Sequence, residues 1–237
     1  MKSVFLTAEW RHLIMANYVV DPAVLQPHVP AGTELDLYEG KCYVSMVGFM
    51  FLNTKIKGIG IPFHKNFEEV NLRFYVRRMT EDGWRRGVVF IKEIVPKPAI
   101  AWTARLFYRE KYVYHPMKHT IETGDRYNAS YLWKKGGMWH HLSATAETKG
   151  SPILPDTEEM FISDHYYGYS TYSKNKTKEY QVVHPQWNVH KVYDYSFSAD
   201  AGALYGKEFV EPLSSEPASV FLLDGSETSI IIGSYIS

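Results

Sequence analysis

The chain has 237 residues, of which 45% are hydrophobic and 15% aromatic, and its 26 basic and 26 acidic residues give a formal net charge of zero. Binding to a polyanion needs a surplus of basic charge on one face, so nucleic acid is excluded as the expected partner. Cys42 is the only cysteine, which excludes an intrachain disulfide and a thiolate-rich metal site. No window approaches 18 uninterrupted apolar residues, so we expect no spanning helix and a cytoplasmic protein without a membrane partner.

The pattern of apolar residues predicts strands joined by tight turns along most of the chain. A short helix is expected from Asp21-Pro22, because aspartate caps the first turn and proline fits within it. Further short helices are expected from about 157 to 167 and over 199–204. The expected strands are 9–18 (alternatively a helix start), 33–38, 41–52, 67–78, 87–95, 100–108 (alternatively a short helix), 125–133, 138–148, 169–173, 178–183, 187–197, 218–223 and 228–236, the last two paired about Asp224-Gly225.

The predicted connections favour an antiparallel sheet, because hairpin turns dominate. A curled sheet can hide one face of every strand. No internal repeat or long linker interrupts the chain, so we expect a single domain over 1–237. The expected fold class is mainly β or α+β: a strongly curved, mostly antiparallel sheet forming a partly closed barrel around a central cavity, with two or three short helices.

The strand expected at 67–78 has two very different faces. Its even-numbered positions from Val70 to Val76 are apolar and alternate at period two. The opposite face carries Phe67, Glu69, Asn71, Arg73 and Tyr75. These side chains would project in one row, about 6–7 Å apart. On an exposed face the row would be ordinary surface, whereas inside a curved sheet it would be a polar patch in a cavity.

The polar row belongs to a series of segments that run in order from about residue 8 to about residue 197. The series comprises Trp10-Arg-His-Leu13, Val20-Asp-Pro22 through Leu25 to Pro30, Phe67-Glu-Glu-Val-Asn-Leu-Arg-Phe-Tyr-Val76, Trp102-Thr-Ala-Arg105, Tyr112, Met117, Asp164-His-Tyr-Tyr-Gly-Tyr169 and His184-Pro-Gln-Trp187. By these segments the chain resembles the YqjF-like bacterial family, a domain of unknown function placed with the acetoacetate decarboxylase-like superfamily. The resemblance implies a strongly bent antiparallel β-structure around a central cavity that Glu69, Asn71 and Arg73 would line.

The decarboxylase branch of that superfamily acts through a lysine that forms a Schiff base with a ketone. Apolar walls and a second cation make such a lysine lose its proton more easily. In the matching segment, counted from Arg105, the position of the reactive lysine falls on Tyr112. Lys111 lies one residue short, where a strand side chain points the other way. The double lysine is absent, so decarboxylation through an imine is not expected.

Glu69 and Arg73 are the expected catalytic residues, with Glu69 moving a proton while the cation keeps it ionised. The alternative is a structural ion pair between them, and both interpretations can hold together. The expected substrate-binding residues are Asn71, Tyr75, Arg105, Tyr112 and His184. Arg105 would offer a second cation to a carboxylate, and His184 would close the pocket or bond to the backbone. Tyr75 and Tyr112 are alternatively core residues.

The ten histidines do not indicate a metal site. His140 and His141 are adjacent and would point to opposite faces of a strand, and His184 and His190 would lie about 20 Å apart. Neither a nucleotide-binding glycine loop nor a Gly-x-Ser-x-Gly elbow occurs. We therefore expect no metal and no cofactor.

Three functions remain open from the sequence. The first is a pocket for a small organic molecule, anionic or keto-bearing, with a lyase or proton-transfer reaction that uses Glu69. The second is a non-catalytic binding or sensory domain on the same fold. The third is a structural or interaction protein whose polar row faces solvent. Zero net charge with many aromatic residues is also compatible with a homodimer.

Overall fold

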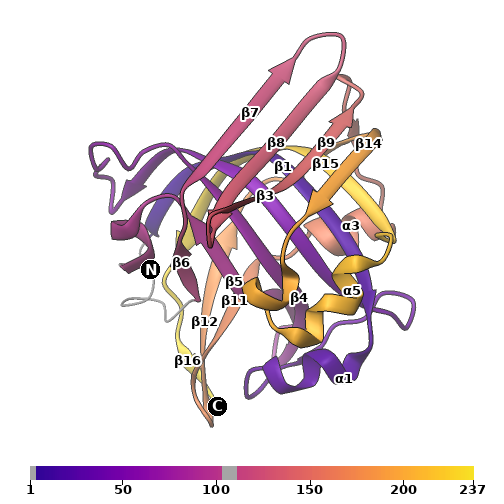
Figure 1. Ribbon diagram of the computed structural model, residues 1–237. Coiled ribbons are helices and arrows are strands. Elements are labelled where there is room, and N and C mark those ends of the chain that lie inside the picture. Colours follow the sequence, from indigo (N-terminus) through magenta and orange to yellow (C-terminus); the bar gives the residue numbers. More distant parts are fainter. Residues whose placement is uncertain (1–3, 103–110) are drawn as a thin grey trace.

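The structure is a computed structural model that describes residues 4–102 and 111–237. Within these residues the strands form a 12-stranded sheet and a 4-stranded sheet, with short helices at their margins (Figure 1). The large sheet contains β1 (Val4–Val20), β2 (Glu34–Leu35), β3 (Cys42–Ile56), β4 (Phe67–Thr80), β5 (Gly83–Val95), β6 (Tyr112–Tyr114), β10 (Ser151–Pro152), β11 (Tyr167–Ser173), β12 (Lys176–Val183), β13 (Asn188–His190), β15 (Ser219–Ile231) and β16 (Tyr235–Ile236). The smaller sheet contains β7 (Met117–Thr123), β8 (Tyr127–Lys135), β9 (Met138–Ala146) and β14 (Val192–Ser198).

The large sheet bends until its hydrogen bonds close a ring. The ring runs β15-β1-β3-β4-β5-β11-β12, and β12 pairs with β15 again through Val182 and Ile230. The pairs in this ring are antiparallel except β11 with β5, and β6 also runs parallel to β5. A ring of this kind gives each of its strands an inner face. The expected mainly β fold with a strongly curved, mostly antiparallel sheet is confirmed.

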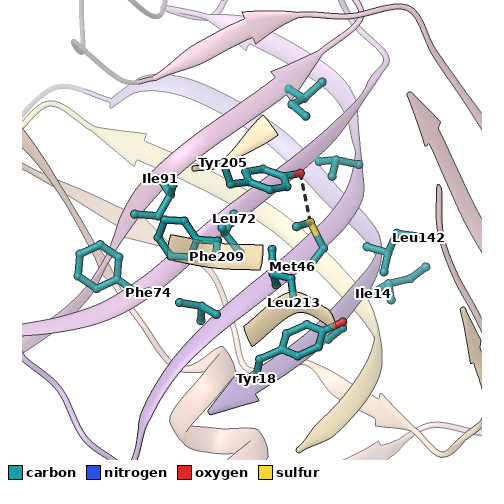
Figure 2. Packing of buried hydrophobic residues seen from close by; sticks show 14 of the residues in the cluster. Ile14, Tyr18, Met46, Leu72, Phe74, Ile91, Leu142, Tyr205, Phe209 and Leu213 are labelled. Carbon is teal, nitrogen blue, oxygen red and sulfur yellow. Dashed lines mark hydrogen bonds between the residues drawn. The ribbon is translucent and has the colours of Figure 1, made fainter. Parts of the chain in front are cut away.

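A large apolar core fills the space between the outer face of the ring and the smaller sheet. Leu72 and Phe74 of β4 and Met46 of β3 lie in it, and all three are fully buried. Figure 2 shows Tyr205, Phe209 and Leu213, which come from the helical segment beyond β14, packed over this face. The apolar face of β4 is therefore buried against the smaller sheet and the helices, and its polar face turns into the ring.

The helices are short and more numerous than the two or three expected. Among the described residues they are α1 (Pro22–Leu25), α3 (Glu158–Ser163), α4 (Ala201–Leu204), α5 (Val210–Ser214) and a helical stretch over 98–102, with 3-10 turns at Gln26–His28 and Lys207–Phe209. Asp21 caps α1 by accepting from the backbone N–H of Ala23, and Thr157 caps α3 by accepting from that of Met160. No helix in the described part of the chain is long and apolar enough to cross a membrane.

The expected hairpin at the end of the chain is wrong, because 218–223 and 228–236 do not fold back on each other. β15 continues through Gly225 and pairs with β1 over almost its whole length. Gly225 has φ of 76°, and a Cβ there would lie 1.9 Å from the carbonyl oxygen of Trp10. Glycine at this position lets the strand bend closely against β1.

Other expected elements differ in their boundaries. The strand expected at 187–197 is divided at Lys191, so that β13 joins the large sheet and β14 the smaller one. The strand expected at 33–38 is reduced to β2, and α3 ends at Ser163 instead of near 167. Residues 98–102 are helical, and the rest of the segment expected at 100–108 lies outside the described residues. β7 and α5 were not predicted.

Candidate functional site

The polar row of β4 faces a cavity inside the ring. Glu69 is 2% exposed, Asn71 1% and Arg73 9%, and all three line a cavity of about 60 Å³. The period-two alternation of β4 produces this arrangement, because every second side chain points to the same face. The remaining walls of the cavity include Trp10, Phe49, Glu93, Tyr112, His165 and His184.

Glu69 is held by two hydrogen bonds within this cavity. Its Oε1 accepts from Asn71 Nδ2 at 2.9 Å, and its Oε2 accepts from the hydroxyl of Tyr112 at 2.9 Å. Three strands bring these groups together, because Glu93 of β5 lies opposite both Asn71 of β4 and Tyr112 of β6. Two carboxyl groups, an amide and a phenol therefore line one wall.

Burial raises the pKa of Glu69 to about 7, although the hydrogen bonds from Asn71 and Tyr112 and the charge of Arg73 act in the opposite direction. A carboxyl group with this pKa can both accept and donate a proton near neutral pH. Burial and the nearby carboxyl groups of Glu69 and Glu93 raise the pKa of Tyr112 well above 10. Tyr112 therefore stays a neutral phenol that donates to Glu69.

Arg73 does not form the ion pair with Glu69 that the sequence suggested as an alternative. The two residues lie four apart on one strand, about 13 Å between Cα atoms. The guanidinium instead donates from Nη2 to the carbonyl oxygen of Ile162 at 3.2 Å and contacts Met15 Sδ at 3.7 Å. Within the described residues, Nε has no hydrogen-bond partner and no carboxylate lies within ion-pair distance of Arg73. Arg73 is thus a buried cation that forms no direct ion pair with a carboxylate of the described residues.

The cavity gathers several buried polar atoms that no described residue satisfies. They are Nε1 of Trp10, Oδ1 of Asn71, Nε of Arg73 and both ring nitrogens of His165. Buried polar atoms in proteins nearly always have a partner, so a cluster of exceptions distinguishes this cavity from the packed core. Donors and acceptors are both present in this set.

His165 lies beside Arg73 but stays uncharged. Its ring lies 4.7 Å from that of Tyr75 and 5.7 Å from that of Phe161, between centroids. Burial, together with the charges of Arg86 and Arg73, lowers its pKa to about 4, although Asp36 Oδ2, 3.8 Å from Nε2, acts in the opposite direction. A neutral imidazole can donate a hydrogen bond to a ligand from one nitrogen and accept from the other.

The structure places the remaining predicted site residues as follows. His184 lines the cavity, stacks on Trp187 at 4.3 Å, and has Nδ1 at 2.9 Å from the carbonyl oxygen of Pro185. Tyr75 lies behind the cavity, where its hydroxyl is 2.6 Å from Ser45 Oγ and its ring lies beside the guanidinium of Arg73. Arg105 lies outside the described residues.

Trp10, Glu93 and His165 line the cavity but were not predicted as site residues. Trp10 and His165 belong to segments that carry the family resemblance, which was the one available signal for them. Glu93 is an acid within an apolar strand, next to Ile94 and Val95. Among the residues that the structure describes, no group of three or more His, Cys, Asp or Glu could hold a metal ion.

A second, apolar cavity of about 180 Å³ adjoins the polar one. The two cavities share Phe51, Glu93, Tyr112, Tyr180 and Ile230 as walls. Across the described parts of the chain, no lysine lines either cavity, and the sequence of 103–110 contains none.

Comparison with known proteins identifies relatives in sequence and in fold. The sequence profile of the DUF2071 family, described as an uncharacterized conserved protein, matches residues 7–227. The uncharacterized protein YqjF of Bacillus subtilis (strain 168) is 29% identical over 182 residues, which are 75% of this chain and 72% of YqjF.

Among solved structures, the acetoacetate decarboxylase of Legionella pneumophila superposes with a TM-score of 0.67 at 16% identity, over 98% of this chain and 87% of that one. The enduracididine biosynthesis enzyme MppR superposes with a TM-score of 0.65 at 11% identity, over 100% of this chain and 88% of that one. These two likenesses show a common fold.

Proposed function

Since the chain belongs to the DUF2071 family and has the acetoacetate decarboxylase-like fold, we propose that its polar cavity binds a small organic anion. The observation that carries this proposal is Arg73, a buried guanidinium with a partnerless Nε and no carboxylate in reach within the described residues. A buried charge is costly unless it is paired, and a carboxylate is the group that matches guanidinium geometry best.

The size of the cavity supports a ligand head of a few heavy atoms. About 60 Å³ corresponds to roughly four water molecules, at about 15 Å³ for each. A carboxylate with a neighbouring keto group fits such a space, and the partnerless nitrogens of Trp10 and His165 can donate hydrogen bonds to its oxygens. One solved complex of the fold neighbour MppR contains pyruvate, which is a 2-oxo acid.

The reaction that we propose is proton transfer at the carbon next to the keto group. Glu69 takes that proton, and the electron pair of the C–H bond moves toward the keto oxygen to give an enolate. Return of the proton from Glu69 restores the keto form. The pKa of about 7 suits Glu69 to both steps, and the hydrogen bond from Tyr112 orients its carboxyl group.

A Schiff base plays no part in this proposal. Lys111 is exposed at the start of β6, and Lys92 donates from Nζ to the carbonyl oxygen of Leu204 on the outer side of the sheet. Borohydride added together with a 2-oxo acid should therefore leave the mass of the intact protein unchanged. A stable adduct on any lysine would contradict the proton-transfer mechanism.

Binding is tested first, by calorimetry with pyruvate, 2-oxobutyrate and the matching methyl esters. Wild type should bind the acids and not the esters, and Arg73→Met should bind the acids about tenfold more weakly or worse, because it loses a charge-assisted contact. Arg77→Met is the matched control, since Arg77 lies on the same strand but pairs with the exposed Glu34. Equal affinity in wild type and Arg73→Met would overturn the anion site.

Catalysis is tested separately, by following hydrogen–deuterium exchange at the carbon next to the keto group in D₂O by NMR. Glu69→Gln should retain binding of the acid and lose exchange. If Glu69→Gln exchanges as fast as an active wild type, Glu69 is not the base and the proposed step is wrong. If wild type exchanges no faster than the acid alone, the chain is a non-catalytic binding domain and the enzymatic part of the proposal is wrong.

A further inference from the structure

The apolar cavity lies at one end of the polar row, and this position limits what the ligand can be. Its walls come from the ends of β1 and β3, the loop after β3, the start of β4 and the helical residues 98–102, and they include Leu6, Ile56, Ile61, Phe67 and Ile100. It has about three times the volume of the polar cavity. Ile61 is 44% exposed, so this cavity reaches the surface of the described structure.

The inward face of β4 orders the two cavities along one line. Arg73, Asn71 and Glu69 line the polar cavity, and the next inward residue, Phe67, lines the apolar one. Successive inward residues are about 6.7 Å apart, so the row from Arg73 to Phe67 spans about 20 Å between Cα atoms. Glu93 and Tyr112 border both cavities, and Tyr112 donates to Glu69, so Glu69 lies next to the junction on the polar side.

Charge fixes the direction in which an anion can lie along this row. The guanidinium of Arg73 is at the inner end, whereas Glu93 borders both cavities and Glu69 lies two inward positions nearer to the apolar cavity than Arg73. An anionic group placed beside these two acids would lie away from the cation of Arg73, and one in the apolar cavity would be desolvated without a partner. The anionic head must therefore lie at Arg73, with the rest of the molecule directed past Glu69 toward Phe67.

We propose that the ligand is an amphipathic organic acid: a carboxylate or 2-oxo acid whose alkyl or aryl chain of several carbons occupies the apolar cavity. This inference rests on the proposed function, because it takes Arg73 as the site of the head. The apolar walls bind the chain by burying its surface, and Glu69 faces the carbons between head and chain. A short acid such as pyruvate would occupy the head site alone.

The test is a series of straight-chain 2-oxo acids from 3 to 12 carbons, titrated into the intact protein by calorimetry. Affinity should rise about fourfold for each methylene that enters the apolar cavity, and it should level off once the cavity is full. Ile61→Asp should flatten the rise for long chains and leave the affinity for the shortest acids unchanged, because Ile61 lines only the apolar cavity. Ile56→Asn provides a second variant of the same cavity, and Met138→Asp, on the distant β8–β9 hairpin, is the control.

Two outcomes separate this inference from the proposed function. If short and long acids bind equally well to wild type, the chain site is wrong and the anion site stands. If no acid of any length binds, the proposed function itself is wrong. Straight-chain alcohols of equal length should bind at least about tenfold more weakly than the acids, and alcohols that bind equally tightly would show that Arg73 does not select the head.

Discussion

The pKa of Glu69 has a consequence for folding stability that can be measured without knowing the ligand. In the folded protein this pKa is about 7, against a reference value of 4.5. Between pH 4.5 and 7 the folded state therefore holds a proton that the unfolded state has released. The free energy of unfolding must fall as the pH rises through this window, and it must level off above pH 7.

The size of this loss of stability follows from the difference between the folded and the reference pKa of Glu69. A separation of about 2.5 pKa units, at 1.36 kcal/mol for each unit, gives a loss of about 3 kcal/mol between pH 4.5 and pH 7. Glutamine cannot ionise, so Glu69→Gln removes this dependence. The stability of Glu69→Gln relative to wild type should therefore increase by about 3 kcal/mol from pH 4.5 to pH 7 and stay constant above it.

The free energy of unfolding of wild type, measured against pH, would not show the effect of Glu69 alone, because the contribution of His165 changes with pH in the opposite direction. Its pKa falls from 6.5 to about 4 in the folded protein, so its contribution to stability is complete above pH 6.5 and is lost as the pH falls toward 4. The two dependences overlap and largely cancel between pH 4.5 and 6.5. Glu69→Gln should reveal the dependence of His165 as a loss of stability toward acid pH.

The assay is urea unfolding followed by tryptophan fluorescence from pH 4.5 to pH 8 at constant ionic strength. The dependence of the unfolding free energy on urea should be the same in both proteins, which ensures that the midpoints report stability. Glu81→Gln, in the exposed turn between β4 and β5, is the control and should follow the wild-type profile. Parallel profiles for wild type and Glu69→Gln would refute the reasoning, because Glu69 would then titrate alike in folded and unfolded chains.

Three further predictions concern single side chains. Arg73→Met should raise the free energy of unfolding of the ligand-free protein by about 1–3 kcal/mol in urea at pH 7, because a buried cation without a carboxylate is replaced by an apolar side chain; a loss of stability would show that the guanidinium is compensated. Gly225→Ala should destabilise by more than about 2 kcal/mol in the same assay, since a Cβ would lie 1.9 Å from the carbonyl oxygen of Trp10 at a φ of 76°. Lys92→Met should bind 2-oxo acids as wild type does in calorimetry, because Lys92 points away from both cavities; weakened binding would place that lysine at the site.

The elements that the sequence predicted well are those whose signals are local. Period-two alternation identified β4 and its two faces, Asp21 caps the helix that it was expected to begin, and Thr157, one of two expected caps with Asp156, caps α3. The hairpin of β4 and β5 about Glu81-Asp82-Gly83 was also predictable, because turn residues separate two strand patterns. Each of these features depends on residues close together in the chain.

The composition of the cavity wall could not be predicted in the same way, because a bulge in β5 changes it. A regular hairpin that starts from Thr80 opposite Gly83 would place Lys92 opposite Asn71, and would turn the lysine into the cavity. The register shifts between Leu72 and Arg73, so Glu93 lies opposite Asn71 and Lys92 points outward. No residue pattern in β5 predicts this shift. The shift nevertheless places the acid Glu93 at the site instead of the cation Lys92.

The division of the segment 187–197 between two sheets could not be predicted from the sequence either. The pattern from 187 to 197 indicates one continuous strand, but β13 pairs with β15 in the ring and β14 pairs with β9 in the smaller sheet. Which sheet a segment joins depends on partners more than 30 residues away in sequence. Local alternation cannot contain that information, although it identifies the strands themselves.

The positions where the protein departs from ordinary packing rules support a functional interpretation of the cavity. Trp10, Asn71, Arg73 and His165 carry partnerless buried polar atoms and line one cavity, and the partnerless hydroxyl of Thr54 lines the adjoining one. Two other partnerless nitrogens, Nε1 of Trp133 and Nε2 of His190, line neither cavity, so most but not all of these atoms gather around the two adjoining spaces. A chain selected for stability alone would place an apolar residue at position 73, and the proposed anion site gives a reason for the cation there.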